Sequence, residues 1–357
     1  YNNLKSMFKQ YVMPYLEIMG GKRLSGSISN QTAKNSALSI LCACVAIKGK
    51  TTLADVPVIE EVNRMIELLS SLGVKIERKG NKLFVDASGE IKMSKLDKKA
   101  ASMMRSSLFL WGALAKRVKK YRMHWSGGCR LGERTVRPHI FALKKLGVNI
   151  ETKKDYFEIE NTSSKSEEVI MYESGDSATE NAIMAAVLKK GATTIKMASA
   201  NYMVQDLCYF LNNAGAKISG IGTTTLTVKG VEKLKPDTEY HIMPDPIIAM
   251  TFLSAGITTG SEITVKNCPL DFLELELCKL EVMGQKMHIG KKKKSKNGHF
   301  QLADITVYPS QLKALPDKIY GRPFPGLNVD NLPLFVPILT KAKGRTLVHD
   351  WAYENRS

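Results

Sequence analysis

The chain has 357 residues, and its 52 lysines and arginines against 34 aspartates and glutamates give a formal net charge of +18. Apolar residues make up 44% and charged residues 24%, which excludes a chain disordered along its whole length and suits two domains. Six cysteines are too few for a disulfide scaffold, and the longest apolar stretch, residues 37–47, is too short to cross a bilayer. We therefore expect a soluble, cytoplasmic protein without a membrane span.

The positive charge is spread along the chain, apart from a run of four lysines at residues 291–294 that we expect in a loop. Such a balance suits a nucleic acid, an anionic membrane or a phosphorylated small substrate. Aromatic residues make up only 7% and are not interleaved with basic residues on one element, as a nucleic-acid surface would require. We expect a solvated surface with a local anion site and no specific nucleic-acid partner.

A pattern repeats along the chain. A β-rich stretch follows Gly49, an amphipathic helical pattern runs from Val62 to Leu72, and Gly73 suits a left-handed C-cap before a hairpin. Gly73 lies 24 positions after Gly49, and the same offset separates two further glycine pairs, namely Gly191 and Gly215, and Gly260 and Gly284. These equal offsets predict repeated strand–helix–hairpin units in a mixed α/β protein.

The sequence Leu-Gly-Val-x-Ile, which closes the first unit at residues 72–76, occurs once more at residues 146–150. The sequence Lys-Gly-x-Thr, which opens the first unit at residues 48–51, recurs at the start of residues 343–347. The glycine that would close this last unit would lie beyond Ser357. We therefore expect the C-terminal part of the fold to be incomplete in this chain.

The first segment that could carry chemistry is residues 29–36, which precede an apolar helix at residues 37–47. Thr32 is a plausible N-cap, which would place Lys34 and Asn35 in the first helical turn. Free backbone N–H groups and the helix dipole favour an anion there. A solvated lysine with no further role is the plain alternative.

The second segment, residues 125–134, is a glycine-rich loop that carries Cys129 between Trp125 and Arg134. Neighbouring cations such as Arg130 and Arg134 lower the pKa of a thiol and prepare it for proton transfer or nucleophilic attack. The alternative is a cysteine buried as a small apolar side chain.

The third segment, residues 323–333, is constrained by proline and glycine and presents one carboxylate, Asp330. A carboxylate held in this way can take a proton from a hydroxyl, although a solvated or capping aspartate is the alternative. Cys42, Cys44 and the six histidines show no metal-ligand spacing. We expect no metal and no cofactor.

Together these segments resemble the family of UDP-N-acetylglucosamine enolpyruvyl transferases. The pieces that carry the resemblance are Gly127-Gly128-Cys129-x-Leu131-Gly132-x-Arg134, Ala33-Lys34-Asn35, Met104-Arg105-Ser106, Ala178-Thr179-Glu180-Asn181, Pro323-Phe324-Pro325-Gly326 through Asp330, and Glu354-Asn355-Arg356. The resemblance implies a two-domain, inside-out α/β barrel with helices inside and sheets outside. It also implies a catalytic-loop domain of three units at residues 34–242, and a second, apparently truncated domain at residues 1–33 and 243–357.

The resemblance further implies transfer of the enolpyruvyl group of phosphoenolpyruvate to the 3-hydroxyl of UDP-N-acetylglucosamine, with release of phosphate, in the first committed step of peptidoglycan synthesis. By the same resemblance Lys34 and Asn35 would hold phosphoenolpyruvate and Arg134 its phosphate, Cys129 would be the general acid, and Asp330 would be the base. The remaining residues expected to bind substrate are Arg105, Val136, Pro138, His139, Gly175, Asp176, Ala352 and Arg356.

The segments that would read the nucleotide depart from the family pattern. Arg137 stands where the family usually has an aspartate, and Asp176 would lie near a pyrophosphate. Three alternatives stay open for this reason: a related enolpyruvyl transferase with a different acceptor, the sister 5-enolpyruvylshikimate-3-phosphate synthase, and a non-catalytic descendant that binds anions or nucleic acid. A Lys-Ser pair at the first helix and no cysteine loop would mark the sister enzyme, so Asn35 and Cys129 speak against it.

Overall fold

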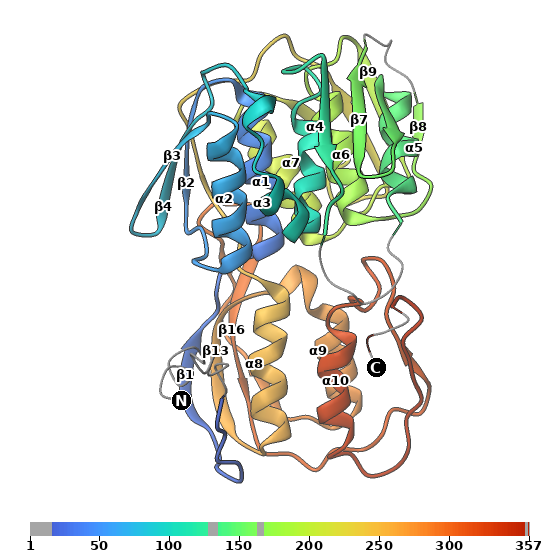
Figure 1. Cartoon of the computed structure of the whole chain (residues 1–357). Coiled ribbons are helices and arrows are strands. Elements are labelled where there is room, and N and C mark those ends of the chain that lie inside the picture. Colours follow the sequence, from blue (N-terminus) through green and yellow to red (C-terminus); the bar gives the residue numbers. More distant parts are fainter. Residues whose placement is uncertain (1–15, 128–134, 163–167, 354–355, 357) are drawn as a thin grey trace, which may run out of the picture.

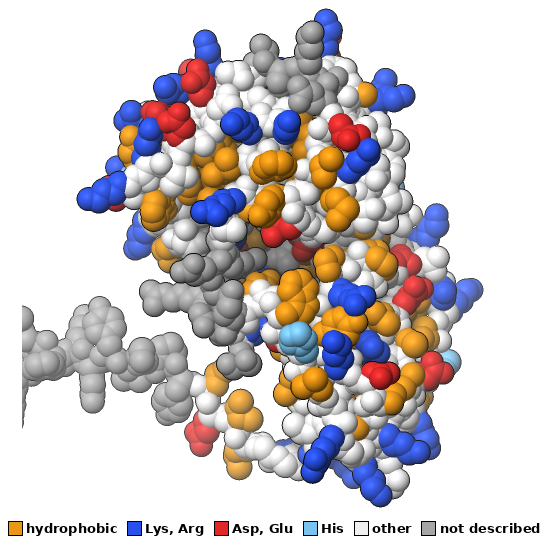
Figure 2. Space-filling view, turned by 90° about the vertical axis from the view of Figure 1, so that its right-hand side faces the viewer, with side chains coloured by type: hydrophobic (Ala, Val, Ile, Leu, Met, Phe, Trp, Pro, Cys, Tyr) orange, Lys and Arg blue, Asp and Glu red, His pale blue; other side chains and the backbone are white. Residues whose placement is uncertain are grey.

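The computed structural model of this chain describes residues 16–127, 135–162, 168–353 and 356. Two bodies lie one above the other (Figure 1), and each has its own cluster of buried apolar side chains. The larger body holds most of the first 245 residues, and the smaller body holds the N-terminal strand and the rest of the chain. Lysines and arginines are scattered over both bodies on the face shown in Figure 2.

The first repeated unit has the predicted form. Strand β2 (Lys50–Ala54), helix α2 (Glu60–Ser71) and the hairpin of β3 (Lys75–Lys79) and β4 (Lys82–Asp86) follow one another. Gly73 has a φ of +96° between the helix and the hairpin, which is the left-handed position predicted for it. The alternation of buried and exposed residues along β2 and β4 places one face of this sheet against the helices.

In the residues that the structure describes, the same unit occurs three more times. Its copies are β5 (Lys120–His124), α5 (Arg137–Lys145), β6 (Val148–Thr152) and β7 (Tyr156–Asn161); β9 (Ala192–Lys196), α7 (Tyr202–Asn213), β10 (Lys217–Ser219) and β11 (Thr225–Lys229); and β13 (Glu262–Pro269), α9 (Glu274–Val282), β14 (Met287–Ile289) and β16 (Gln301–Val307). The closing residues Gly147, Gly215 and Gly284 all have positive φ, at 80°, 89° and 85°. The prediction of repeated strand–helix–hairpin units is confirmed.

In the described part of the chain, three sheets surround the larger body. Their strand orders are β12-β2-β4-β3, β5-β7-β6 and β10-β11-β9-β8, where β8 is Glu168–Ile170 and β12 is Thr238–His241. Between these sheets lie α1 (Lys34–Ile47), α4 (Leu110–Ala113) and α6 (Asp176–Ala186). Helix α1 is buried from Ser36 to Ile47, because sheets and other helices cover it on all sides. Helices inside and sheets outside confirm the predicted fold class.

A glycine allows two of the inner helices to pack closely. A Cβ on Gly112 of α4 would lie 2.4 Å from the carbonyl oxygen of Asn181 in α6, so any other residue here would push the helices apart. The amide oxygen of the Asn181 side chain accepts a hydrogen bond from the Gly112 N–H at 2.8 Å. Asn181, one of the motif residues, therefore joins α4 to α6.

The larger body also contains short elements beside α2 and α4: η1 (Met93–Lys95), α3 (Lys98–Met103) and η2 (Arg105–Phe109).

The smaller body has a mixed sheet in the order β1-β13-β16-β14, with β15 (Lys293–Lys294) also on β16, and a separate pair of β17 (Ile319–Tyr320) and β18 (Val348–His349). Strand β1 (Ser25–Ser29) runs parallel to β13. Helices α8 (Pro246–Thr258) and α10 (Leu332–Leu339) and the short η3 (Leu270–Phe272) complete the body.

Two segments of the described chain cross between the bodies, one from β1 to α1 and one from β12 to α8. They are hydrogen-bonded to each other. The N–H of Ala33 donates to the carbonyl of Met243 at 2.8 Å, and the N–H of Asp245 donates to the carbonyl of Gln31 at 2.8 Å. The boundaries predicted at residues 34 and 242 fall in these segments, and the division into domains there stays a prediction.

A loop of the smaller body makes a third connection. The Asn297 amide donates to Asp206 Oδ1 at 3.2 Å, to the Tyr240 hydroxyl at 3.2 Å and to the carbonyl of His241 at 3.0 Å. Beside it, Lys296 pairs with the carboxylate of Asp55 at 3.0 Å. All of the partners belong to the larger body, so this loop ties the two bodies together without a covalent link.

Two sequence predictions are wrong in detail. The apolar helix begins at Lys34, which places Lys34 and Asn35 in its first turn as predicted, but its N-cap is Ala33 rather than Thr32. Alanine has no side-chain acceptor, so Asp245 of the second crossing segment accepts from the N–H of Lys34, at 3.3 Å. The lysine run at residues 291–294 is not wholly a loop, because Lys293 and Lys294 pair with β16.

No helix in the described part of the chain is both long and apolar enough to span a membrane.

Asp206 is a buried acid that binds both the second crossing segment and the loop of Asn297. Its carboxylate accepts from the Tyr240 hydroxyl at 2.6 Å, from the Asn297 amide and from the N–H of Met243 at 3.3 Å. Burial raises the pKa of Asp206 from 3.8 to about 7, although the hydrogen bonds from Tyr240 and Met243 oppose the shift.

Because the folded protein holds the Asp206 proton more tightly than the unfolded chain does, we expect a stabilising contribution that is lost as the pH rises from about 4 to about 7. In Asp206→Asn this part of the pH dependence should disappear. At pH 5 the variant should also be less stable by about 1–3 kcal/mol, since an amide cannot accept all three hydrogen bonds. The difference should be smaller at pH 7.5, where the buried carboxylate of the unchanged protein is ionised. Urea unfolding at pH 5 and pH 7.5 measures both effects. Asp97→Asn, at the exposed cap of α3, is the control. If the free energy of unfolding of Asp206→Asn fell between pH 5 and pH 7.5 as much as that of the unchanged protein, Asp206 would not be the source of this pH dependence.

Candidate active site

Helices from both bodies begin at the level where the bodies meet. Helices α1, α6 and α7 start at the lower end of the larger body, and α8 starts at the upper end of the smaller body (Figure 1). The first turn of a helix carries free N–H groups and the positive end of the dipole. This level of the molecule therefore favours an anion before any charged side chain is considered.

Lys34 is the first residue of α1 and lies at this junction. Its ammonium pairs with Glu61 Oε2 at 2.8 Å, and Glu61 Oε1 accepts from the Ser106 hydroxyl at 2.9 Å. The Lys34 side chain remains 44% exposed, so its charge is available to a ligand as well as to Glu61. These contacts tie the starts of α1, α2 and η2 together.

Asn35 and Asp176 are joined through the start of α7. The Asn35 amide donates to the Tyr202 hydroxyl at 3.0 Å. The Asp176 carboxylate, at the start of α6 directly after the N-cap Gly175, accepts from the hydroxyl of Ser199 and from the amide of Asn201 at 3.2 Å. Asn201 in turn caps α7. The carboxylate of Asp176 is thus held against the α7 cap.

The predicted nucleotide-binding residues of α5 line the same end of the larger body. Val136 is the N-cap of α5, and Pro138 is buried in its first turn. His139 is 3% exposed; its ring nitrogens contact the Ser177 hydroxyl at 3.2 Å and the Asn181 amide at 3.1 Å. His139 therefore positions α5 against α6.

Arg105, at the start of η2, reaches the beginning of α5. Its Nη2 donates to the carbonyl of Thr135 at 2.9 Å. The side chain of Thr135 accepts from the N–H of Arg137, at 3.1 Å, which shapes the turn before the helix. With the contacts of Lys34, Asn35, Asp176 and His139, a chain of polar contacts runs around the lower end of the larger body.

Tyr202 faces the acidic groups of this junction. Burial raises the pKa of the Tyr202 hydroxyl, and the negative charges of Asp245 and Asp330 raise it further. Its ring packs on Phe272 of the smaller body at 6.0 Å between centroids, and Phe272 packs on Phe324 at 5.2 Å. These contacts bring the loop that carries Asp330 to the starts of α1 and α7.

Arg356 binds two carboxylates of the smaller body. Its Nε donates to Asp350 Oδ2 at 2.6 Å, and its Nη1 lies 3.5 Å from Asp330 Oδ1. Partial burial works against ionisation of Asp350, but the hydrogen bond and charge of Arg356 lower its pKa. The N–H of Ala352 also donates to Asp350, at 3.3 Å. Ala352 and Arg356 therefore organise this corner through Asp350, beside a half-exposed Asp330.

The junction thus unites Lys34, Asn35, Asp176 and Asp330, while Gly175, Val136, Pro138, His139 and Arg105 line the end of the larger body. Cys129 and Arg134 lie outside the described residues. Sequence reasoning missed Glu61, Tyr202 and Asp245; of these, Asp245 had a signal, because an aspartate before a proline is a helix-start pattern. In the parts of the chain that the structure describes, no three His, Cys, Asp or Glu side chains are grouped to hold a metal ion.

Comparison with known proteins agrees with this arrangement. Residues 18–348 match the family described as EPSP synthase (3-phosphoshikimate 1-carboxyvinyltransferase). The chain belongs to this enolpyruvyl transferase family. It is accordingly an enzyme of the 1-carboxyvinyltransferase type, and the predicted family is confirmed.

Among enolpyruvyl transferases, one similar protein is UDP-N-acetylglucosamine 1-carboxyvinyltransferase 2 of Caldanaerobacter subterraneus subsp. tengcongensis, 36% identical over 96% of this chain and 79% of the relative. UDP-N-acetylglucosamine 1-carboxyvinyltransferase 1 of Symbiobacterium thermophilum is 33% identical over 95% and 75%. The enolpyruvyl transferase NikO from Streptomyces tendae has a similar fold, with a TM-score of 0.79 at 20% identity, covering 93% of this chain and 76% of that chain. EPSP synthase from Acinetobacter baumannii has a TM-score of 0.66 at 17% identity, covering 92% and 74%.

Proposed function

We propose that this enzyme transfers the enolpyruvyl group of phosphoenolpyruvate to the 3-hydroxyl of UDP-N-acetylglucosamine and releases phosphate, a step of peptidoglycan synthesis. The observation that carries the proposal is the meeting of helix starts from both bodies around Lys34, with Asp330 of the smaller body close enough to Tyr202 for its negative charge to raise the pKa of that hydroxyl. A trianionic donor would be held there by the N–H groups of the helix starts together with Lys34 and Arg134.

In the proposed reaction Lys34 and Asn35 bind the donor, and Arg134 contacts its phosphate. The Asp330 carboxylate accepts the proton of the sugar 3-hydroxyl while the hydroxyl oxygen forms a bond to C2 of phosphoenolpyruvate. The Cys129 thiol donates its proton to the methylene carbon C3 of phosphoenolpyruvate. The resulting tetrahedral intermediate then loses phosphate from C2 and a proton from C3, which restores the double bond. Arg356 holds Asp330 in place through its contact at 3.5 Å.

The acceptor is supported by the names of the relatives, all of which were matched over about three quarters of their length or more. The Asp176 carboxylate accepts hydrogen bonds from Ser199 and Asn201, which hold it against the cap of α7. Arg137 has an exposed side chain at the start of α5. The charges of Asp176 and Arg137 are the departures from the family pattern that the proposed acceptor has to accommodate.

The function is tested by measuring phosphate release from phosphoenolpyruvate with each of several acceptors. We expect release with UDP-N-acetylglucosamine and none with shikimate 3-phosphate or with other phosphorylated sugars. Asp330→Asn should lower the rate by about 100-fold or more, because a general base contributes a factor of that size. Asp317→Asn, an exposed carboxylate of the same body, should leave the rate unchanged. Turnover of shikimate 3-phosphate would contradict the proposed acceptor, and full activity of Asp330→Asn would contradict the proposed base.

Arg137→Asp restores the acidic residue that the family usually has. We expect it to bind UDP-N-acetylglucosamine about tenfold more tightly, since a carboxylate would accept a charge-assisted hydrogen bond from the uracil. Titration calorimetry measures the change. Lys144→Asp makes the same change of charge on an exposed residue near the other end of α5 and should have little effect. Equal or weaker binding by Arg137→Asp would mean that the nucleotide is bound in another way.

The thiol of Cys129 is expected to react first with electrophiles. Among the described cysteines, Cys42, Cys44, Cys208 and Cys268 are buried, and burial raises the pKa of each thiol, to about 12 for Cys44. The exposed Cys278 is therefore the relevant competitor. Fosfomycin, a phosphonate epoxide that resembles the donor, should label Cys129 and spare Cys278, whereas iodoacetamide should reach both. Peptide mapping that finds Cys278 labelled first by fosfomycin would refute the prediction.

A further inference from the structure

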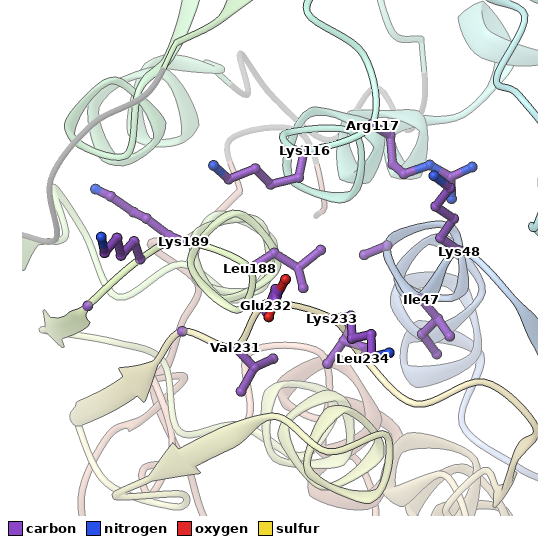
Figure 3. Close-up of a pocket in the computed structure, with 14 residues that line it drawn as sticks. Ile47, Lys48, Lys116, Arg117, Leu188, Lys189, Val231, Glu232, Lys233 and Leu234 are labelled. Atoms are coloured by element: carbon purple, nitrogen blue, oxygen red, sulfur yellow. The ribbon is translucent and has the colours of Figure 1, made fainter.

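A basic cavity lies at the opposite end of the larger body from the candidate active site. It has a volume of about 610 Å³ and is formed where α1, α4 and α6 end, beside residues 230–234 (Figure 3). Helices α1 and α6 begin at Lys34 and Asp176, so each runs from the candidate active site to this cavity. At about 1.5 Å per residue, the length of α1 separates the two places by about 20 Å.

The walls of the cavity are strongly positive. Of the described residues that line it, one is acidic, Glu232, and six are basic: Lys48, Lys116, Arg117, Lys189, Lys190 and Lys233. The three helix C-termini contribute at most about one and a half negative charges between them. The helix ends and Glu232 therefore balance only about half of the positive charge of the six basic residues. Stabilisation of the helix ends does not explain why so many cations line the cavity.

The cations have different surroundings. Arg117 donates to the carbonyls of Val45, Ala87 and Gly89, so this residue serves the fold. Lys189 is only 3% exposed, so most of its side chain is packed into the wall. Lys116 and Lys190 are exposed and free to turn toward a ligand.

The cavity is built from closely fitted backbone. A Cβ on Gly230 would lie 1.4 Å from the carbonyl oxygen of Lys189, so the two wall segments touch and only glycine fits. Lys48 closes α1 with a φ of +53°, a left-handed position that glycine or asparagine usually takes. The strained backbone places a lysine at the cavity where a glycine would be easier to accommodate.

We propose that this cavity is a second anion-binding site, distinct from the candidate active site, for a small molecule that carries at least two phosphate groups. Such a ligand supplies two or more negative charges to the facing lysines. Apolar side chains of Ile47, Leu188 and Val231 also line the cavity (Figure 3), which leaves room for an organic part such as a nucleoside beside the phosphates. The proposal does not depend on the identity of the acceptor.

Titration of the full chain with pyrophosphate, at constant ionic strength near 0.15 M, tests the proposal. Lys116→Gln with Lys190→Gln should weaken binding at the cavity by at least about tenfold, because two charge-assisted contacts are lost. Lys291→Gln with Lys292→Gln removes the same charge from exposed lysines of the smaller body and should change binding less than about twofold. Lys34→Gln separates the two sites, since binding at the cavity should persist in it.

A second titration, with adenosine diphosphate in place of pyrophosphate, shows whether the organic part of a ligand adds affinity. Tighter binding of adenosine diphosphate that is lost in Lys116→Gln with Lys190→Gln would indicate that the site binds a nucleotide. Equal binding of the two compounds would indicate that the site recognises only the phosphate groups. No binding of either compound by the unchanged chain below about 1 mM would overturn the proposal. So would equal weakening in the two double variants, which would reflect net charge alone, or binding that disappears in Lys34→Gln and survives in the cavity variant.

Discussion

The arrangement of the molecule depends on the bonding between the two segments that cross from one body to the other. The backbone hydrogen bonds between Ala33 and Met243 and between Gln31 and Asp245 align these segments side by side. Their alignment places the start of α1 against the start of α8, where the Asp245 carboxylate accepts from Lys34 and from the first turn of its own helix. One acidic side chain thus fixes the helix starts of both bodies, and the candidate active site is built around this junction.

Carboxylates of the protein neutralise part of the positive charge at the junction and leave the rest for a ligand. Lys34 is paired with Glu61 and Arg356 with Asp350, so the cations are held in place while part of their charge is already neutralised. The helix starts add positive potential that no side chain needs to carry. An anionic substrate entering this region therefore meets oriented groups and does not have to order flexible lysines, which lowers the entropic cost of binding.

The fold followed from local signals to a large extent. Gly73, Gly147, Gly215 and Gly284 all have the positive φ expected at the end of a helix, and the alternation within the hairpins gave the sheets. Local signals failed at the start of α1. Thr32 has the right chemistry for an N-cap, but the crossing segment holds it in an isolated bridge with Pro244, and an acid 211 residues away in sequence takes over the N–H of Lys34.

The sequence by itself determined the repeated unit, the family and the residue types gathered for anion chemistry, because glycine conformations, helical periodicity and short motifs act over a few neighbouring residues. Only the tertiary structure decided which of these groups meet. The partners of Asp206 include Asn297, and those of Tyr202 include Asn35 and Phe272, and the lysines of the basic cavity come from separate units of the chain. Such pairings depend on how whole helices and sheets pack, and packing is settled by the burial of the entire core rather than by any local pattern.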